Sequence, residues 1–233
     1  MPTSTLPSRA RTGRRPRLLV TAAAALAVIS SGLVPATAST GTAGAYSAPL
    51  RTAVRNLPVA HENNAGYDRD RSFGEWRDLD RDCRNTRHEV LVQESRITPT
   101  YSSRRCTVKA GRWVTSWDNR THRYPSTVQI DHTVPVAEAW GSGARRWTQT
   151  RRKAFYNDLG DKRSLNAQTT SLNRAKSAKG PEAWMPRANR CRYVQEWVAV
   201  KIRWRLTVDP AEKAALTRLA SQCSNVTLRV NRV

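Results

Sequence analysis

The sequence has few acidic residues, few histidines and few cysteines, and each shortage narrows what the protein can be. Its 18 acidic residues stand against 40 basic ones, giving a formal net charge of +22. The four cysteines include no Cys-x-x-Cys pair of the kind typical of zinc sites. After Ala38 no apolar run approaches the roughly 20 residues that span a bilayer. We therefore expect the chain beyond Ala38 to lie outside the membrane.

Residues 1–38 are typical of a signal peptide. An arginine-rich stretch precedes the apolar run 18–34, and the small residues Ala36 to Ala38 offer a cleavage site. We predict export with cleavage after Ala38. An uncleaved membrane anchor is the alternative, although the run is short and rich in Ala and Ser. Residues 39–58 show no clear apolar period, so we predict a flexible entry segment followed by one domain over residues 59–233.

Export would place the four cysteines in an oxidising compartment, which favours two disulfides over a metal site. Three pairings are open. Cys83 with Cys106 and Cys191 with Cys223 is the simplest, because each pair closes a short local loop.

The basic charge favours a polyanionic partner, since Lys and Arg displace condensed counterions from phosphate backbones. Solubility and an arginine-rich coding bias explain the same charge without any partner. Charge alone therefore leaves nucleic acid and a cell-surface polyanion both open. The Arg-rich stretch 145–153 is correspondingly either a nucleic-acid contact or a solvated helix face.

The spacing of apolar residues predicts a mixed α+β fold. Alternation in STVQIDH predicts a strand that ends at Asp131 and His132, and RSLNAQTT is a second candidate strand. A hairpin with Gly111 at its turn is expected within residues 106–118. Helices are expected at 85–92, 136–140, 148–159, 171–177, 191–206 and from Pro210 to Cys223.

The string DHTVP at residues 131–135 is followed by Asn166 and then by NRAK at residues 173–176. Taken singly, Asp131 could cap a turn, the asparagines could be turn residues and Lys176 could face solvent. In this order they resemble the HNH, or ββα-metal, endonuclease family. Looser matches to secreted bacterial nucleases of this kind extend the resemblance over about residues 67–223.

The resemblance implies a small ββα-metal core of strand, strand and helix, with additional helices and a hairpin stabilised by the two disulfides. It implies that Asp131 and Asn173 bind a divalent metal, Mg²⁺ or alternatively Mn²⁺. His132 would act as general base on the attacking water. Hard oxygen ligands suit magnesium, and a neutral imidazole accepts a proton at working pH.

Three further roles follow from the resemblance. Lys176 would hold the scissile phosphate, Asn166 would brace the loop, and Arg87 would stabilise the cleaved phosphate. A surface position is the alternative for Arg87. The other histidines, His61, His88 and His122, lie in segments that favour exposed positions, so His132 is the expected base.

These expectations together describe a secreted, metal-dependent endonuclease of low sequence specificity. It would act as a monomer on DNA, with RNA as the alternative substrate, without stable membrane association. The alternative is a non-catalytic secreted basic protein that binds DNA or an acidic cell-surface polymer. Charge explains that alternative, but charge gives no reason for DHTVP and NRAK to occur in order.

Overall fold

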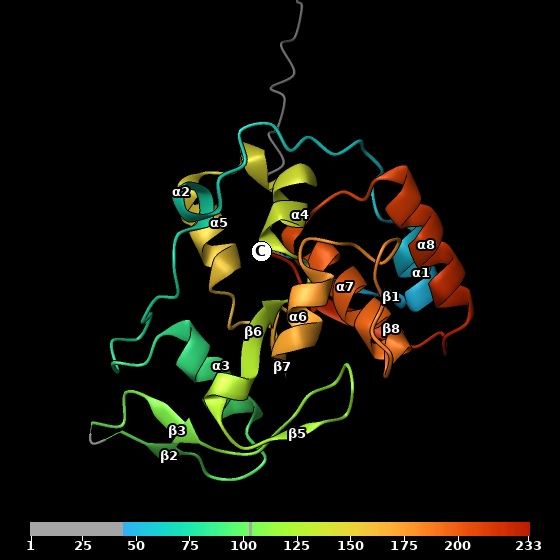
Figure 1. Ribbon diagram of the computed structural model, residues 1–233. Helices are drawn as coiled ribbons and strands as arrows, with labels where there is room; N and C mark the ends of the chain where they lie inside the picture. Colours follow the sequence, from blue (N-terminus) through green and yellow to red (C-terminus); the bar gives the residue numbers. More distant parts are fainter. Residues whose placement is uncertain (1–43, 103) are drawn as a thin grey trace, which may run out of the picture. The chain divides into compact units, whose positions relative to one another are not determined.

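The computed structural model describes residues 44–102 and 104–233 of the chain. The predicted signal peptide and its cleavage after Ala38 lie outside the described residues. Helices and strands are mixed along the chain, as the α+β prediction requires, and the described strands pair two by two in small antiparallel sheets (Figure 1). No helix within the described ranges combines the length and the apolar character needed to cross a bilayer.

In chain order the elements are β1 (Ala45–Pro49), α1 (Leu50–Arg55), α2 (Arg69–Phe73), α3 (Thr86–Glu94), β2 (Thr100–Tyr101), β3 (Val108–Ala110), β4 (Trp113–Val114), β5 (Thr121–His122), the 3-10 helix η1 (Pro125–Thr127), β6 (Val128–His132), α4 (Val136–Gly141), the 3-10 helix η2 (Ala144–Arg146), α5 (Gln149–Tyr156), β7 (Leu165–Thr169), α6 (Thr170–Lys176), α7 (Arg190–Trp204), α8 (Pro210–Ser221) and β8 (Thr227–Asn231). Each helix expected from the sequence is present, with its ends shifted by a few residues.

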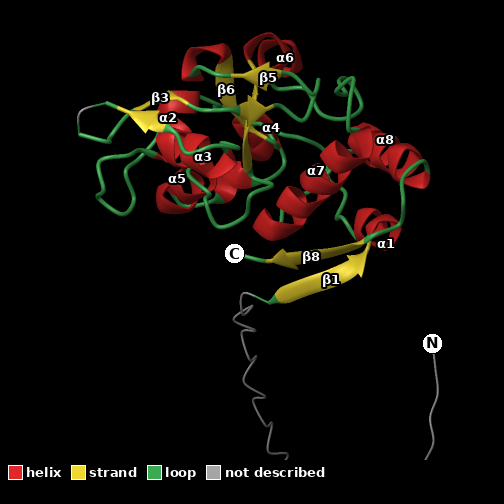
Figure 2. Ribbon diagram, turned by 90° about the horizontal axis from the view of Figure 1, so that it is seen from below, coloured by secondary structure: helices red, strands yellow, loops and turns green. Residues whose placement is uncertain are grey.

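The predicted flexible entry segment, residues 39–58, is wrong from Ala45 onward. β1 pairs with β8 along its whole length, and Figure 2 shows the two strands side by side. α1 follows at once and buries Leu50, Ala53 and Val54 in the main core. Those positions have the i, i+3, i+4 spacing of an amphipathic helix, which the Ala- and Thr-rich composition concealed.

The predicted hairpin around Gly111 is also wrong, because β3 pairs with β2 and β4 pairs with β5. Gly111 serves a close contact instead of a turn. A Cβ atom there would lie 2.6 Å from the Trp113 ring, which folds back over it, and the Trp113 indole donates a hydrogen bond to the carbonyl of Leu91 at 2.8 Å. The glycine is required because a buried tryptophan packs against its backbone.

α7 is the central helix of the larger core, and Val194, Trp197 and Val198 on it are fully buried. The Cys191–Cys223 disulfide joins the start of α7 to the residues just after α8, and Cys83–Cys106 is the second disulfide. Both predicted pairings are confirmed. All eight tryptophans lie in the two hydrophobic clusters or pack against them.

β6 and β7 form an antiparallel pair in which Asp131 lies opposite Asn166, and α6 follows β7 without a loop (Figure 1). Side chains alternate across the pair. Val128 and Ile130 pack with α3 in the smaller hydrophobic cluster, whereas Asp131 points toward α6. The two strands therefore carry an apolar face on α3 and a polar face on α6.

Candidate active site

A cleft of about 360 Å³ opens where β6 ends, bounded by α4, α6 and the segment just before α2. Three of the predicted residues line it together: Asp131, His132 and Asn173. His132 is the one histidine among the lining residues. The strand end thus brings a carboxylate, an imidazole and an amide to one concave surface.

The His132 ring is held by aromatic neighbours and by one backbone hydrogen bond. It stacks on Trp76 with 5.1 Å between ring centroids, and its Nε2 donates to the carbonyl of Tyr156 at 2.9 Å. This bond fixes the tautomer, because the proton on Nε2 leaves Nδ1 as the free lone pair. Burial lowers the pKa of His132 to about 3, with a smaller contribution from the positive charge of Arg69. The ring is therefore neutral at physiological pH.

Asp131 is buried and forms an ion pair with Lys176. The Lys176 amine donates to both carboxylate oxygens, at 2.8 and 2.9 Å, and to the carbonyl of His132 at 2.8 Å. Burial raises the pKa of Asp131 to about 6 and lowers that of Lys176, because both charges are removed from water. Lys176 was predicted to hold the scissile phosphate. In the structure its amine is buried, pairs with Asp131 and is not among the groups that line the cleft.

The two predicted asparagines have different surroundings. Asn173 donates through Nδ2 to the side-chain oxygen of Gln129 at 3.0 Å. The Oδ1 atom of Asn173 therefore stays available as a hydrogen-bond acceptor or a ligand. Asn166 is buried, donates to the Thr133 hydroxyl at 2.8 Å and accepts from Gln168 at 3.1 Å. Asn173 can offer an oxygen to a ligand in the cleft, whereas Asn166 braces the turn that follows β6.

Arg87 is not among the residues that line the cleft, and its phosphate role stays a prediction. Its guanidinium donates to the carbonyls of Pro125 at 3.0 Å and Val128 at 3.4 Å, and burial lowers its pKa. The sequence position of Arg87, four residues after Cys83, did not reveal that α3 packs the arginine against the start of β6. Arg87 anchors that strand.

The Arg-rich stretch 145–153 also packs against the protein. Arg151 lies over the Trp147 ring and donates to the carbonyl of Val233 at 3.0 Å, and Arg152 donates to the carbonyl of Ser72 at 3.0 Å. Of its basic residues, Arg145 and Arg146 are exposed, whereas Arg151, Arg152 and Lys153 are half-buried.

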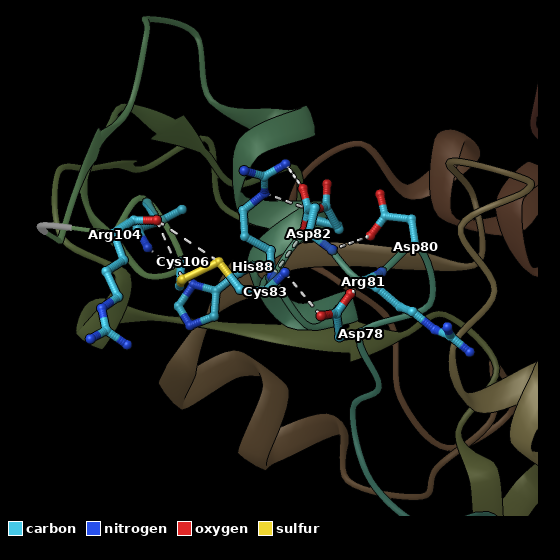
Figure 3. Close-up of a disulfide and its surroundings, with 11 residues drawn as sticks. Asp78, Asp80, Arg81, Asp82, Cys83, His88, Arg104 and Cys106 are labelled. Atoms are coloured by element: carbon cyan, nitrogen blue, oxygen red, sulfur yellow. Dashed lines mark hydrogen bonds and ion pairs between the residues drawn. A yellow bond between two sulfur atoms is a disulfide. The ribbon is translucent and has the colours of Figure 1, made fainter.

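Asp78, Asp80 and Asp82 lie together on the exposed loop before α3, with ligand oxygens within 4.8 Å of one another. Figure 3 shows them beside the Cys83–Cys106 disulfide, with Asp78 accepting from the backbone N–H groups of Arg81 and Cys83 at 2.7 and 2.9 Å. These hydrogen bonds brace the loop that carries the disulfide.

Sequence reasoning missed several residues that shape the cleft. Trp76 supplies the stacking face for His132, and the backbone carbonyl of Tyr156 fixes its tautomer. Tyr67, just before α2, and Arg69, the first residue of α2, also line the cleft. No local pattern marks any of them, because a backbone carbonyl has no sequence signature and arginine is abundant throughout the chain.

Fold and site define a mixed α+β protein with a polar cleft built at the end of an antiparallel strand pair. Residues 81–219 match the family described as GmrSD restriction endonucleases, C-terminal domain. This match spans more than half of the chain, so the protein belongs to that nuclease-related family. The matched range contains Asp131, His132 and Asn173, whereas Tyr67, Arg69 and Trp76 precede it.

A second comparison concerns a relative named as an uncharacterized secreted protein from Arthroderma benhamiae. The chain is 39% identical to it over 160 residues, which cover 68% of this chain and 76% of that protein. No solved structure matches the chain.

Proposed function

We propose that the protein is a secreted, metal-dependent endonuclease of the HNH type that hydrolyses phosphodiester bonds of DNA with low sequence specificity, RNA being the alternative substrate. The observation that carries this proposal is the state of His132. A neutral imidazole, with its Nε2 proton committed to Tyr156, shares one cleft with Asp131 and Asn173. Membership of a nuclease-related family and the net charge of +22 support it.

His132 has the properties of a general base that is activated by its substrate. Its pKa of about 3 keeps Nδ1 unprotonated before substrate binds. A phosphodiester bound beside the ring brings negative charge, which raises the pKa of the imidazole and favours proton uptake from the attacking water. The bond from Nε2 to Tyr156 holds the ring while Nδ1 receives that proton.

The donors in the cleft fit a hard divalent cation. Asp131 offers a carboxylate, and Asn173 offers an amide oxygen that the bond to Gln129 orients. Mg²⁺ and Mn²⁺ prefer oxygen ligands and keep several waters, so two protein ligands suffice. A bound cation would supply neutralisation of charge on the phosphate oxygens. Lys176 provides a countercharge for Asp131.

Secretion is part of the proposal. The relative from Arthroderma benhamiae is named as secreted, and the two disulfides are typical of an oxidising compartment. The arginine-rich, apolar start of the chain is typical of an export signal.

The test is cleavage of plasmid DNA and of RNA by the disulfide-intact protein. We expect cleavage in Mg²⁺ or Mn²⁺, its loss in EDTA, and at least a roughly 100-fold lower rate for His132→Ala, the usual contribution of a general base. His132→Gln serves as a second variant that retains more of the side-chain volume, and the exposed His61→Ala is the matched control. DNA binding by His132→Ala should persist.

Two outcomes would overturn the proposal. A wild-type protein that binds DNA but leaves DNA and RNA intact in both metals would support the non-catalytic polyanion-binding alternative. If His132→Ala and His132→Gln cleaved at the rate of His61→Ala, His132 would not be the general base.

A further inference from the structure

One wall of the cleft comes from outside the family match. Tyr67 and Arg69 line the cleft together with Asp131 and His132 of β6, yet they precede residue 81, where the match begins. The wall has a defined backbone, because Asp68 caps α2 by accepting from the N–H of Arg71 at 2.9 Å. A segment that precedes the family match thus contributes to the cleft.

Arg69 is held in place by a single residue that also holds the base. Its Nη2 donates to the Tyr156 hydroxyl at 3.0 Å, and its guanidinium lies 5.6 Å from the centre of the Tyr156 ring. The backbone carbonyl of the same tyrosine accepts the Nε2 proton of His132 at 2.9 Å. Tyr156 therefore couples the position of a cation to the position of the imidazole.

The charge of Arg69 has no carboxylate partner within ion-pair distance in the described part of the chain. Its acidic neighbours in sequence, Asp68 and Asp70, form no ion pair with it, and the Asp68 carboxylate is engaged in capping α2. Lys176 is withdrawn onto Asp131. Among the residues that line the cleft, Arg69 and Arg174 are then the cationic ones. A guanidinium with one N–H committed to Tyr156 keeps four donors for another acceptor.

We propose that Arg69 binds the non-bridging oxygens of the phosphate that lies beside His132, and that the segment from Tyr67 to Arg69 is a substrate-binding wall contributed by the part of the chain before the family match. This inference rests on the proposed function for the identity of the substrate. The planar guanidinium matches the geometry of a phosphate, and its position beside the base selects the phosphate to be cleaved. Arg69 here takes the role that the sequence assigned to Lys176 and Arg87.

The experiment measures binding separately from cleavage. In a His132→Ala background, with EDTA present, the affinity for a fluorescein-labelled DNA duplex is measured by fluorescence anisotropy over a range of NaCl concentrations, with a labelled RNA strand as a second probe. Arg69→Ala is compared with Arg71→Ala, a matched control because Arg71 is exposed on the same helix and does not line the cleft.

We expect Arg69→Ala to weaken binding about 10- to 100-fold at low salt, as the loss of a charge-assisted hydrogen bond predicts. The slope of log affinity against log salt should fall by about 0.9, the value for one lost phosphate contact on duplex DNA. Arg69→Lys should keep the slope but lose affinity. Arg71→Ala should bind DNA with the affinity of the His132→Ala protein. Its slope should differ from that of the His132→Ala protein by less than half of the change expected for Arg69→Ala.

Tyr156→Phe tests the support of Arg69. It removes the hydroxyl that anchors the guanidinium while keeping the ring and the carbonyl that holds His132. In the otherwise wild-type protein, with cleavage as the readout, KM should rise more than kcat falls, and the melting temperature should stay near the wild-type value. A fall in kcat with unchanged KM would overturn the coupling.

The outcomes separate this inference from the proposed function. If the wild type cleaves DNA or RNA but Arg69→Ala keeps the salt slope of Arg71→Ala, the role of Arg69 is refuted and the proposed nuclease function stands. If the wild type cleaves neither polymer while Arg69→Ala still loses the slope, the nuclease proposal fails and Arg69 is a phosphate contact of a binding protein.

Discussion

Replacing Lys176 by Met tests whether the centre of the cleft depends on a buried ion pair. Lys176 is 0% exposed and Asp131 is 5% exposed, and the amine donates to both carboxylate oxygens and to the carbonyl of His132. Met keeps most of the unbranched stem, so its packing against Trp117, whose ring centre lies 5.4 Å from the amine, is largely retained. The change therefore removes chiefly the charge and its hydrogen bonds.

Breaking a buried pair by removing one partner typically costs about 3 to 5 kcal/mol, because the other charge is left unpaired in the interior. We expect Lys176→Met to lower the free energy of unfolding by an amount in that range, a large share of the roughly 5 to 15 kcal/mol that stabilises a native domain. The assay is urea unfolding in EDTA, followed through the fluorescence of the eight tryptophans.

A double-mutant cycle with Asp131→Asn isolates the pair. Because the double variant leaves neither charge uncompensated, its destabilisation should fall short of the sum of the single variants by about 2 kcal/mol or more. Lys179→Met, an exposed lysine just beyond α6, should change stability by no more than about 0.5 kcal/mol. If Lys176→Met matched that control, or if the two single effects simply added, the buried ion pair would be refuted.

Two further predictions concern the scaffold. Glu94 accepts from the N–H of Ala167 at 3.0 Å, and burial raises its pKa from 4.5 to about 7. Between these two values the native state retains a proton that the unfolded chain has lost. The contribution of Glu94 to stability therefore falls as pH rises from about 4.5 through 7. Glu94→Gln should therefore raise the urea midpoint at pH 8 but not at pH 4, and an equal shift at both would contradict the assignment. Replacing Cys191 and Cys223 together by Ala opens a loop with a sequence separation of 32, and urea unfolding should show a loss of about 4 kcal/mol by chain entropy, whereas a loss below about 1 kcal/mol would mean that the crosslink constrains little.

The sequence predicted the elements whose signal is local. Alternation placed β6, and apolar periodicity placed α7 and α8. The strand β1 could not be found in this way, because its partner β8 lies at the other end of the chain and pairs with it through backbone groups. Helix α1 had a visible apolar spacing, and composition outweighed it in the prediction.

The same distinction applies to the cleft. Asp131, His132 and Asn173 stand in a compact pattern, and the structure places them on one surface. Arg69 stands in no such pattern, because arginine is abundant in this chain. Its position is defined only when α2 packs against α5 and the guanidinium donates to the Tyr156 hydroxyl. The sequence also did not reveal that Lys176 pairs with Asp131. Helical spacing relates Lys176 to Asn173 on α6, whereas Asp131 lies on β6.

Strand geometry explains why two adjacent residues acquire such different surroundings. In β6 the side chains of Asp131 and His132 leave opposite faces of the strand. One face meets α6, where the Lys176 amine compensates the carboxylate, and the other meets Trp76 and the end of α5, where an apolar wall keeps the imidazole neutral. Within a longer strand these faces would remain separate. Because β6 ends at His132, both side chains reach the same opening, and the carboxylate and the imidazole keep separate surroundings there.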